Sequence, residues 1–175
     1  MEQRTLKRDY YCQGVIFTEY VKIDTQNRAR INCFIVKHWF STEMIIRGTI
    51  IDMTKVDGIV VLENDNIVGL LTYAIRDKVC EIISLDSLIE GKGIGTTLIN
   101  KVIFIAKEAD CKKVIVVTTN DNVKAIGFYQ KRGFDMAHFY RNAMDISRKI
   151  KPSIPLIGDG GILLKHEIEF EMSIT

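Results

Sequence analysis

Proline, histidine and closely spaced cysteine are all scarce in this chain of 175 residues. The two prolines, Pro152 and Pro155, both lie near the C-terminus, so proline marks a break in regular structure only there. The four cysteines show no Cys-x-x-Cys spacing, which favours reduced, mostly buried residues of a cytosolic protein over a disulfide framework. They are Cys12, Cys33, Cys80 and Cys111. The three histidines are equally scattered, so we expect no metal site.

Neither sign of charge predominates, and no long apolar segment occurs. The 24 basic and 22 acidic residues leave a net charge of +2, so bulk charge indicates neither a nucleic-acid partner nor a membrane partner. No apolar run reaches the roughly 20 residues of a membrane span, and the first residues lack the apolar segment of a secretory signal. We therefore expect a cytoplasmic protein with one domain over residues 1–175, its core lying at about 13–173.

Three glycines at alternate positions separate a predicted strand, which starts at Val79, from an apolar-striped helix expected from about Thr97. Gly91, Gly93 and Gly95 leave backbone N–H groups uncovered where that helix begins, and the helix dipole adds partial positive charge there. The pattern predicts a phosphate site. The alternative is a tight strand-to-helix turn that binds no ligand.

Two common phosphate-binding patterns do not fit this glycine loop. A P-loop requires Gly-x-x-x-x-Gly-Lys-Ser/Thr, whereas Lys92 precedes the last two glycines instead of following them. The dinucleotide pattern Gly-x-Gly-x-x-Gly matches Gly93 and Gly95, but Leu98 stands where the third glycine belongs. Neither pattern therefore describes this loop.

A second motif follows the next predicted strand, residues 113–119, and has the form Asn-x-x-Ala-x-x-Phe-Tyr-x-x-x-Gly-Phe. Asn122 is suited to cap a helix, and Gly133 to end it in the left-handed conformation. Three residues of the motif share one helical face because they lie at i, i+3 and i+4. These are Ala125, Phe128 and Tyr129, and Phe134 begins the next strand.

Hydrophobic periodicity and turn residues predict helices and strands along the rest of the chain. Helices are expected after Asp24 or Thr25, after the glycine loop, and at 122–131 and 141–150. The apolar stripe of the helix after the loop is Ile94, Leu98, Val102, Ile105 and Ala109. Strands are expected at 13–21, 58–63, 67–74, 79–87, 113–119, 134–140 and 166–173, with a turn at 64–66 and extended sequence at 43–51. The last strand alternates polar and apolar residues, as a half-buried strand does.

The glycine loop resembles the pyrophosphate loop of the GNAT superfamily of N-acetyltransferases, whose pattern is Arg/Gln-x-x-Gly-x-Gly/Ala. The second motif resembles the GNAT signature at every fixed position. The resemblance implies a single N-acetyltransferase domain of α/β (α+β) class: a mixed, twisted sheet of about seven strands with helices on both faces. Further similarity at 84–87, 118–122 and 151–158 points to a bacterial subgroup of unassigned substrate. The usual second helix is replaced here by the extended residues 43–51, on the acceptor side.

This resemblance implies acetyl-CoA as the co-substrate, with no metal. Its pyrophosphate would be held by the N–H groups of the glycine loop, residues Gly91, Lys92, Gly93, Ile94, Gly95 and Thr96. Its pantetheine would pair, like an added strand, with the backbone at Leu85 and Ser87. Asn122 would contact the cofactor; the alternative for Asn122 is a helix cap alone.

Two side chains are candidates for the chemistry. Tyr129 is the candidate general acid, because a phenol with a pKa near ~10 can protonate a thiolate whose thiol has a pKa near ~8.5; the alternative is an aromatic residue packed on the helix face. Glu81, on the strand before the loop, is the candidate base, acting directly or through a water; the alternative is a half-exposed strand residue. Asp86 is a weaker candidate, and Ser84 could orient a water.

Glu90 departs from the family pattern, which has arginine or glutamine at that position. A carboxylate beside a pyrophosphate would be repulsive, so we expect Glu90 to point to solvent and Lys92 to compensate its charge.

The predicted function is direct transfer of an acetyl group to a primary amine, on a small molecule or a peptide, in a ternary complex. The alternative is a non-catalytic acyl-CoA sensor or scaffold. A third interpretation is transfer of a longer acyl group. The sequence does not identify the acceptor and leaves a homodimer open.

Overall fold

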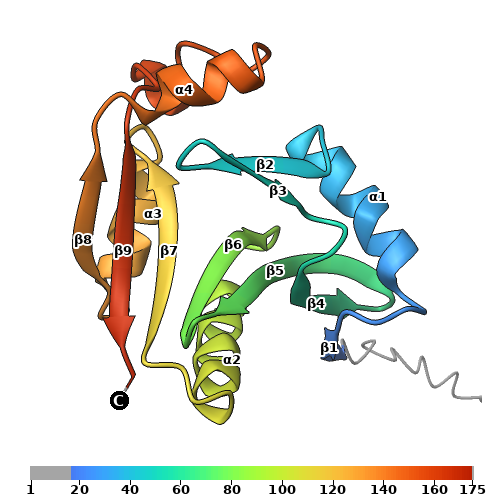
Figure 1. The fold of residues 1–175 in the computed structure, drawn as a ribbon. Helices are drawn as coiled ribbons and strands as arrows, with labels where there is room; N and C mark the ends of the chain where they lie inside the picture. Colours follow the sequence, from blue (N-terminus) through green and yellow to red (C-terminus); the bar gives the residue numbers. More distant parts are fainter. Residues whose placement is uncertain (1–16, 175) are drawn as a thin grey trace, which may run out of the picture.

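Seven strands form one mixed sheet in the computed structural model, which describes residues 17–174 (Figure 1). In spatial order they are β1 (Thr18–Lys22), β4 (Asp57–Glu63), β5 (Asn66–Arg76), β6 (Val79–Ser87), β7 (Lys113–Thr119), β9 (Glu167–Ser173) and β8 (Asp135–Tyr140). Only β6 and β7 are parallel neighbours, and the helix α2 (Ile94–Glu108) connects them. The C-terminal strand β9 lies between β7 and β8. The expected mixed sheet is confirmed.

The two parallel strands diverge along their length. β6 pairs with β7 only over Val79–Ile82, opposite residues 113–116. A bulge in the β5–β6 ladder leaves Ile83 without a partner, and bulges bend the strand that carries them. Beyond Ile82, therefore, the β7-facing edge of β6 has no neighbouring strand among the described residues. Figure 1 shows this divergence in the middle of the sheet.

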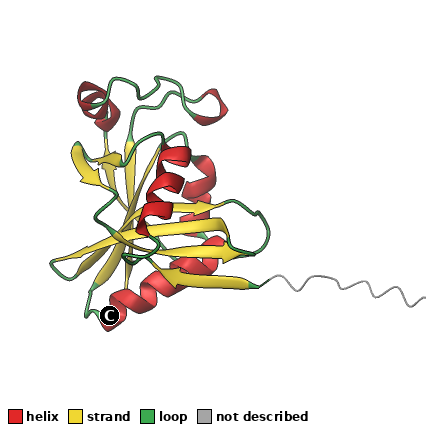
Figure 2. Ribbon diagram, turned by 90° about the vertical axis from the view of Figure 1, so that its right-hand side faces the viewer, coloured by secondary structure: helices red, strands yellow, loops and turns green. Residues whose placement is uncertain are grey.

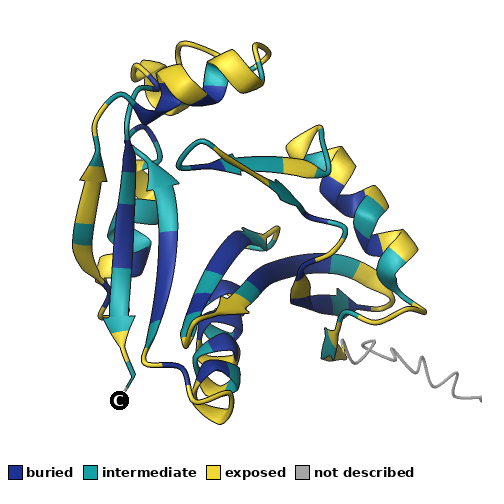
Figure 3. Cartoon of the chain, viewed as in Figure 1, coloured by how far each residue is buried: buried dark blue, intermediate teal, exposed yellow. Residues whose placement is uncertain are grey.

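Helices cover both faces of the sheet, as Figure 2 shows from the side. One buried cluster joins α2 and α3 (Val123–Gln130) to the sheet through residues such as Leu98, Tyr129 and Phe170. A second cluster joins α1 (Arg28–Trp39) and the small strands β2 (Glu43–Ile46) and β3 (Thr49–Asp52) to the opposite face. Figure 3 shows that the middle of the sheet is buried from both sides.

The β2–β3 hairpin occupies residues that the sequence predicts to be extended instead of helical, and the prediction is confirmed. Its two-residue turn consists of Arg47 (φ 50°) and Gly48 (φ 72°), the combination of positive φ values found in type I′ hairpins. A Cβ at position 48 would lie 3.0 Å from Cγ2 of Ile146 on α4 (Ala143–Ile150). The turn therefore packs closely against α4. It lies at the end of the sheet where β7 ends and β9 begins.

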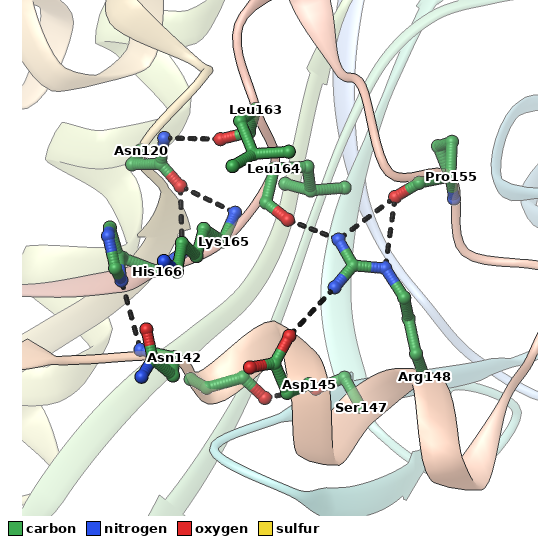
Figure 4. A network of polar contacts seen from close by, with 11 residues as sticks. Asn120, Asn142, Asp145, Ser147, Arg148, Pro155, Leu163, Leu164, Lys165 and His166 are labelled. Carbon is green, nitrogen blue, oxygen red and sulfur yellow. Dashed lines mark hydrogen bonds and ion pairs between the residues drawn. The ribbon is translucent and has the colours of Figure 1, made fainter.

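The segment after α4 is fastened by a network of polar contacts (Figure 4). Arg148 pairs with Asp145 at 3.3 Å and donates to the carbonyl oxygens of Pro155 and Leu164. The Oδ1 atom of Asn120 accepts hydrogen bonds from the N–H groups of residues 165 and 166, at 2.9 and 2.7 Å. A short 3-10 turn, Asp159–Gly161, lies within this segment. The network holds the start of β9 beside the end of β7.

The structure changes some expectations from the sequence. α2 begins at Ile94, three residues before Thr97, and Ala106 continues the buried stripe while Ala109 is exposed. Cys33 is exposed, whereas Cys80 and Cys111 are buried as expected.

The polar face of β9 is also buried, because the β2–β3 hairpin reaches over it. Strand β1 starts at Thr18, and the expected strand residues 13–16, like Cys12, lie outside the described part of the chain. Among the described residues, no helix has the length and apolar character needed to cross a bilayer.

Candidate functional site

The glycine loop has the backbone geometry that an anion site requires. Gly91 (φ 78°) and Gly93 (φ 71°) are both left-handed, and Gly93 is the N-cap of α2. A Cβ on either glycine would have no other atom within 4 Å, so the loop is open to an approaching group. The first N–H groups of a helix, here from Ile94 onward, have no intrahelical acceptor, and the helix dipole adds positive charge.

Gly95 has a different role from the two preceding glycines. A Cβ at this position would lie 3.1 Å from Cζ of Phe128, so its absence lets α2 pack against α3. A cavity of about 440 Å³ adjoins the loop. It is lined by Ser87, Ile89, Glu90, Gly91, Gly93, Ile94, Gly95, Thr96, Phe128 and Arg132.

Arg132 places a positive charge in this cavity, which sequence reasoning missed. Its guanidinium carbon lies 3.4 Å from the centre of the Phe128 ring, and Nη1 donates to the Phe128 carbonyl at 2.7 Å. Its Nε donates to Oγ1 of Thr96 at 3.2 Å. The sequence feature that could have indicated this role is the position of Arg132, which immediately precedes the helix-ending Gly133 and follows Phe128 by one helical turn.

Glu90 and Lys92 do not form the expected compensating pair. The Glu90 side chain is 92% exposed, which confirms that it points to solvent, and its nearest cation is Lys124 at 3.9 Å. Lys92 instead pairs with Glu63 on β4, with Nζ 3.1 Å from Oε2. The loop turns the Lys92 side chain away from position 90 and toward Glu63 on β4. Only the backbone of Lys92 remains part of the loop.

The edge of β6 that leads to the loop is open. Leu85 and Ser87 pair with Leu71 and Gly69 of β5 on one side. On the other side, β7 has already diverged, so no described strand satisfies that edge. An exposed strand edge is a template for an extended ligand or chain. The structure therefore places both predicted backbone positions on an unpaired edge.

Tyr129 is buried in an aromatic cluster and belongs to the hydrophobic core against which Leu85 of β6 packs. Its side chain is 6% exposed, and its ring contacts Phe134 and Phe170 with centroid separations of 5.8 Å. Burial, with a smaller contribution from Asp86, raises the pKa of Tyr129, while Arg132 lowers it. The phenol thus stays protonated over a wide pH range. It is a packed aromatic residue and also has a proton to donate.

Asn122 caps α3 as its position predicts. Its Oδ1 accepts a hydrogen bond from the N–H of Ala125 at 3.1 Å. The left-handed Gly133 (φ 83°) follows the end of α3, also as predicted. A contact between Asn122 and the cofactor stays a prediction.

Glu81 lies on the face of β6 that the β2–β3 hairpin covers. Its Oε1 accepts from Nη2 of Arg47 at 2.6 Å, and its side chain is largely buried. It lines a cavity of about 250 Å³ beneath the hairpin. The other lining residues are Ile46, Arg47, Thr49, Ile51, Val56, Ala74, Arg76, Val79 and Ile83. The candidate base is thus neither free nor half-exposed on a solvated face: it is paired, at the wall of a mostly apolar cavity.

Two further carboxylates, both on β9, contact Arg47. Oε2 of Glu169 accepts from Nη1 of Arg47 at 3.1 Å and from the Tyr140 hydroxyl at 2.8 Å. Oε2 of Glu167 accepts from the backbone N–H of Arg47 at 2.9 Å. Burial raises the pKa of Glu167, and burial together with Glu169 raises the pKa of Tyr140 to about 12. The alternating glutamates of β9 resemble a solvated strand face in sequence, which concealed this cluster.

Asp86 and Ser84 are each engaged by a neighbour. Oδ2 of Asp86 accepts from the Trp39 indole N–H at 3.0 Å, and burial raises the pKa of Asp86 while this hydrogen bond lowers it. The Ser84 hydroxyl is buried and lies 2.8 Å from the Thr72 hydroxyl. Within residues 17–174, no group of three His, Cys, Asp or Glu side chains has the arrangement of a metal site.

Comparison with known proteins gives consistent matches. A model of the Acetyltransferase (GNAT) family matches residues 19–134. The chain is 47% identical over 142 residues to the uncharacterized protein YdhI of Bacillus subtilis, covering 81% of this chain and 89% of YdhI.

Two solved structures share the fold. The IAA acetyltransferase from Bacillus cereus has a TM-score of 0.65 at 18% identity, covering 90% of this chain and 99% of that chain. A GNAT family acetyltransferase from Elizabethkingia anophelis with acetyl-CoA bound has a TM-score of 0.64 at 19% identity, covering 89% of this chain and 97% of that chain.

Proposed function

The chain belongs to the GNAT acetyltransferase family, and we propose that it transfers the acetyl group of acetyl-CoA directly to a primary amine in a ternary complex. One observation carries the proposal: the open edge of β6 begins beyond Ile82, next to Glu81, and runs to the glycine loop. An extended thioester lying on that edge would have its phosphates at the loop and its reactive end near Tyr129 and Glu81.

The cofactor would be held mainly by backbone. The N–H groups of residues 91–96 would bind the pyrophosphate, helped by the α2 dipole. Arg132 would supply the side-chain cation that Glu90 cannot, because its guanidinium already lies in the loop cavity. Leu85 and Ser87 would pair with the pantetheine amides as a neighbouring strand does, and Asn122 would contact the cofactor from the start of α3.

The chemistry would require a base for the amine and an acid for the thiolate. Glu81, directly or through a water, would take a proton from the acceptor ammonium, leaving a lone pair on nitrogen. That nitrogen would attack the thioester carbonyl carbon and form the new C–N bond; as the C–S bond breaks, the nitrogen would lose its second proton to solvent. The Tyr129 hydroxyl would protonate the departing thiolate, after which solvent would return a proton to the phenolate and take one from Glu81. The products are an amide and free CoA.

The acceptor would lie under the β2–β3 hairpin. The cavity there is bounded by apolar side chains of the hairpin and the sheet and carries Glu81 on its wall. We propose that the amine is borne by a small molecule or a peptide, that the protein is bacterial, as YdhI is, and that it acts in the cytoplasm. A homodimer is compatible with this function.

An amine panel tests the function. The protein would be incubated with acetyl-CoA and primary amines of varied charge and size, and release of free thiol would be measured. The proposal is supported if at least one amine causes release of free thiol from acetyl-CoA and if Tyr129→Phe abolishes that release. Tight binding of acetyl-CoA without release for any amine would instead establish the acyl-CoA sensor. A series of longer acyl-CoA thioesters, run in parallel, would reveal a preference for a longer acyl group.

A further inference from the structure

Arg47 contacts carboxylates on two strands that lie on either side of the gap between β6 and β7: β6 itself, and β9, which pairs with β7. Its guanidinium binds Glu81 on β6 at 2.6 Å and Glu169 on β9 at 3.1 Å, and its backbone N–H binds Glu167 on β9 at 2.9 Å. Strand β9 is paired with β7 along its whole length. The tip of the hairpin thus connects β6 to the β7–β9 pair, although β6 and β7 have diverged at this point.

The two guanidinium contacts differ in how firmly each carboxylate is held. Glu169 is 6% exposed, and its Oε2 also accepts from the Tyr140 hydroxyl, whose ring lies 6.0 Å from the Arg47 guanidinium carbon. Glu81 has a single contact, through Oε1, and among the described residues its Oε2 has no hydrogen-bond partner. Glu169 therefore anchors Arg47, and Arg47 in turn holds Glu81.

We infer that Arg47 is a positioning residue for acetyl transfer: anchored on Glu169, it holds Oε1 of Glu81 and leaves Oε2 available to receive the proton of the acceptor amine. The inference rests on the proposed N-acetyltransferase function. It assigns a catalytic consequence to the hairpin that stands in place of the usual second helix. A carboxylate held by one oxygen keeps a fixed orientation, and small displacements of a catalytic group are costly in rate.

Electrostatics reinforce this positioning. Arg47 from the hairpin and Arg76 from β5 line the same cavity as Glu81. Arg47 also contacts Glu167 and Glu169 on β9, and Tyr140 and His138 on β8 lie beside Glu169. On β7, Lys113 is already paired with Glu171 at 2.7 Å. Without Arg47, no cation among the described residues would separate the Glu81 carboxylate from the buried carboxylates of Glu167 and Glu169.

A double-mutant cycle tests the inference. Arg47→Met should lower kcat about 10- to 100-fold, with little change in KM for acetyl-CoA, because the base is no longer oriented. In a Glu81→Gln background the same substitution should lower kcat by less than about two-fold, since the group that Arg47 orients is already absent. Arg47→Lys, which keeps the charge but lacks the forked geometry, should recover part of the rate. Lys113→Met is the matched control, because it removes a sheet ion pair that does not contact Glu81.

A second readout needs no acceptor. In ¹³C NMR spectra at fixed pH, with the Glu81 carboxyl signal assigned by its loss in Glu81→Gln, Arg47→Met should move that signal, because Oε1 of Glu81 loses its hydrogen bond. If Arg47→Met does not fold, as judged by circular dichroism, Arg47→Lys carries both comparisons.

Equal rate losses in the two backgrounds, or an unmoved Glu81 carboxyl signal, would overturn the inference while leaving acetyl transfer intact. Absence of turnover in the wild-type protein would overturn the proposed function itself, and the positioning role with it.

Discussion

The guanidinium of Arg132 stacks on the ring of Phe128, with its central carbon 3.4 Å from the ring centre. That contact, together with hydrogen bonds to the Phe128 carbonyl and the Thr96 hydroxyl, holds a cation beside the glycine loop. The position usually occupied by arginine or glutamine in the family loop carries Glu90 in this chain. The cation beside the loop is therefore Arg132, which follows the end of α3, and not a residue of the loop itself.

Replacing Arg132 by methionine should weaken acetyl-CoA binding about ten-fold at low salt, because one charge-assisted contact to phosphate is lost. Calorimetry at two salt concentrations measures this, and the difference from wild type should shrink at high salt. The control is Lys124→Met, which removes a 94% exposed cation near Glu90 and should leave affinity unchanged. Equal affinity of Arg132→Met and wild type for acetyl-CoA would refute the role of Arg132.

Gly93→Asp and Gly95→Asp should fail in different ways. At position 93 the added carboxylate enters open space where phosphate is expected, so acetyl-CoA binding should be lost while circular dichroism stays native. At position 95 the new Cβ meets the Phe128 ring, so the melting temperature should fall as well. Gly127→Ala, on α3 with open space around it, should leave affinity unchanged and should not lower the melting temperature. Retained affinity in Gly93→Asp would remove the loop assignment.

Glu90→Gln should leave acetyl-CoA affinity almost unchanged at both low and high salt. The carboxylate is 92% exposed and its charge is directed to solvent, where it is strongly screened. The measurement is again calorimetry. A marked tightening at low salt only would show that Glu90 turns toward the pyrophosphate when the cofactor binds.

Tyr129→Phe should lower kcat by roughly 10²–10⁴-fold, with little change in acetyl-CoA affinity, if the phenol protonates the thiolate. Because the pKa of Tyr129 is raised, the proton is retained as pH increases, and the basic limb of the wild-type rate profile should lie above the usual range of a phenol. Thermal stability should change little, because the ring keeps its contacts with Phe134 and Phe170 in the variant. Full turnover in Tyr129→Phe would exclude the general-acid role.

Glu167→Gln should stabilise the protein near pH 7. The folded-state pKa of Glu167 is raised by burial, so its ionised form is disfavoured in the fold, and removing the charge removes that cost. Below the ordinary carboxyl pKa of about 4.3 the group is protonated in both the folded and unfolded states, so the two proteins should then unfold alike. Denaturant unfolding at several pH values measures the difference. A variant less stable than wild type at pH 7 would show that the ionised carboxylate is needed by Arg47.

Local sequence was sufficient where neighbouring residues make the structure. The turn at Asn64 and Asp65, the left-handed Gly133 and the Asn122 cap all depend on contacts within a few residues. The glycine loop is equally local, because the start of α2 and the two left-handed glycines lie side by side in the chain. From these features the sequence predicted the residues of the proposed cofactor end of the candidate site.

The acceptor end was decided by the tertiary structure alone. Arg47 is 34 residues from Glu81 and 122 residues from Glu169, and nothing in those separations predicts a contact. The contact exists because the tip of the hairpin reaches both β6 and β9, and because the register of β9 puts Glu167 and Glu169 on the face toward the hairpin. Helix and strand periodicity determine which residues share a face, but only the packing of distant elements determines whether that face meets water or an arginine.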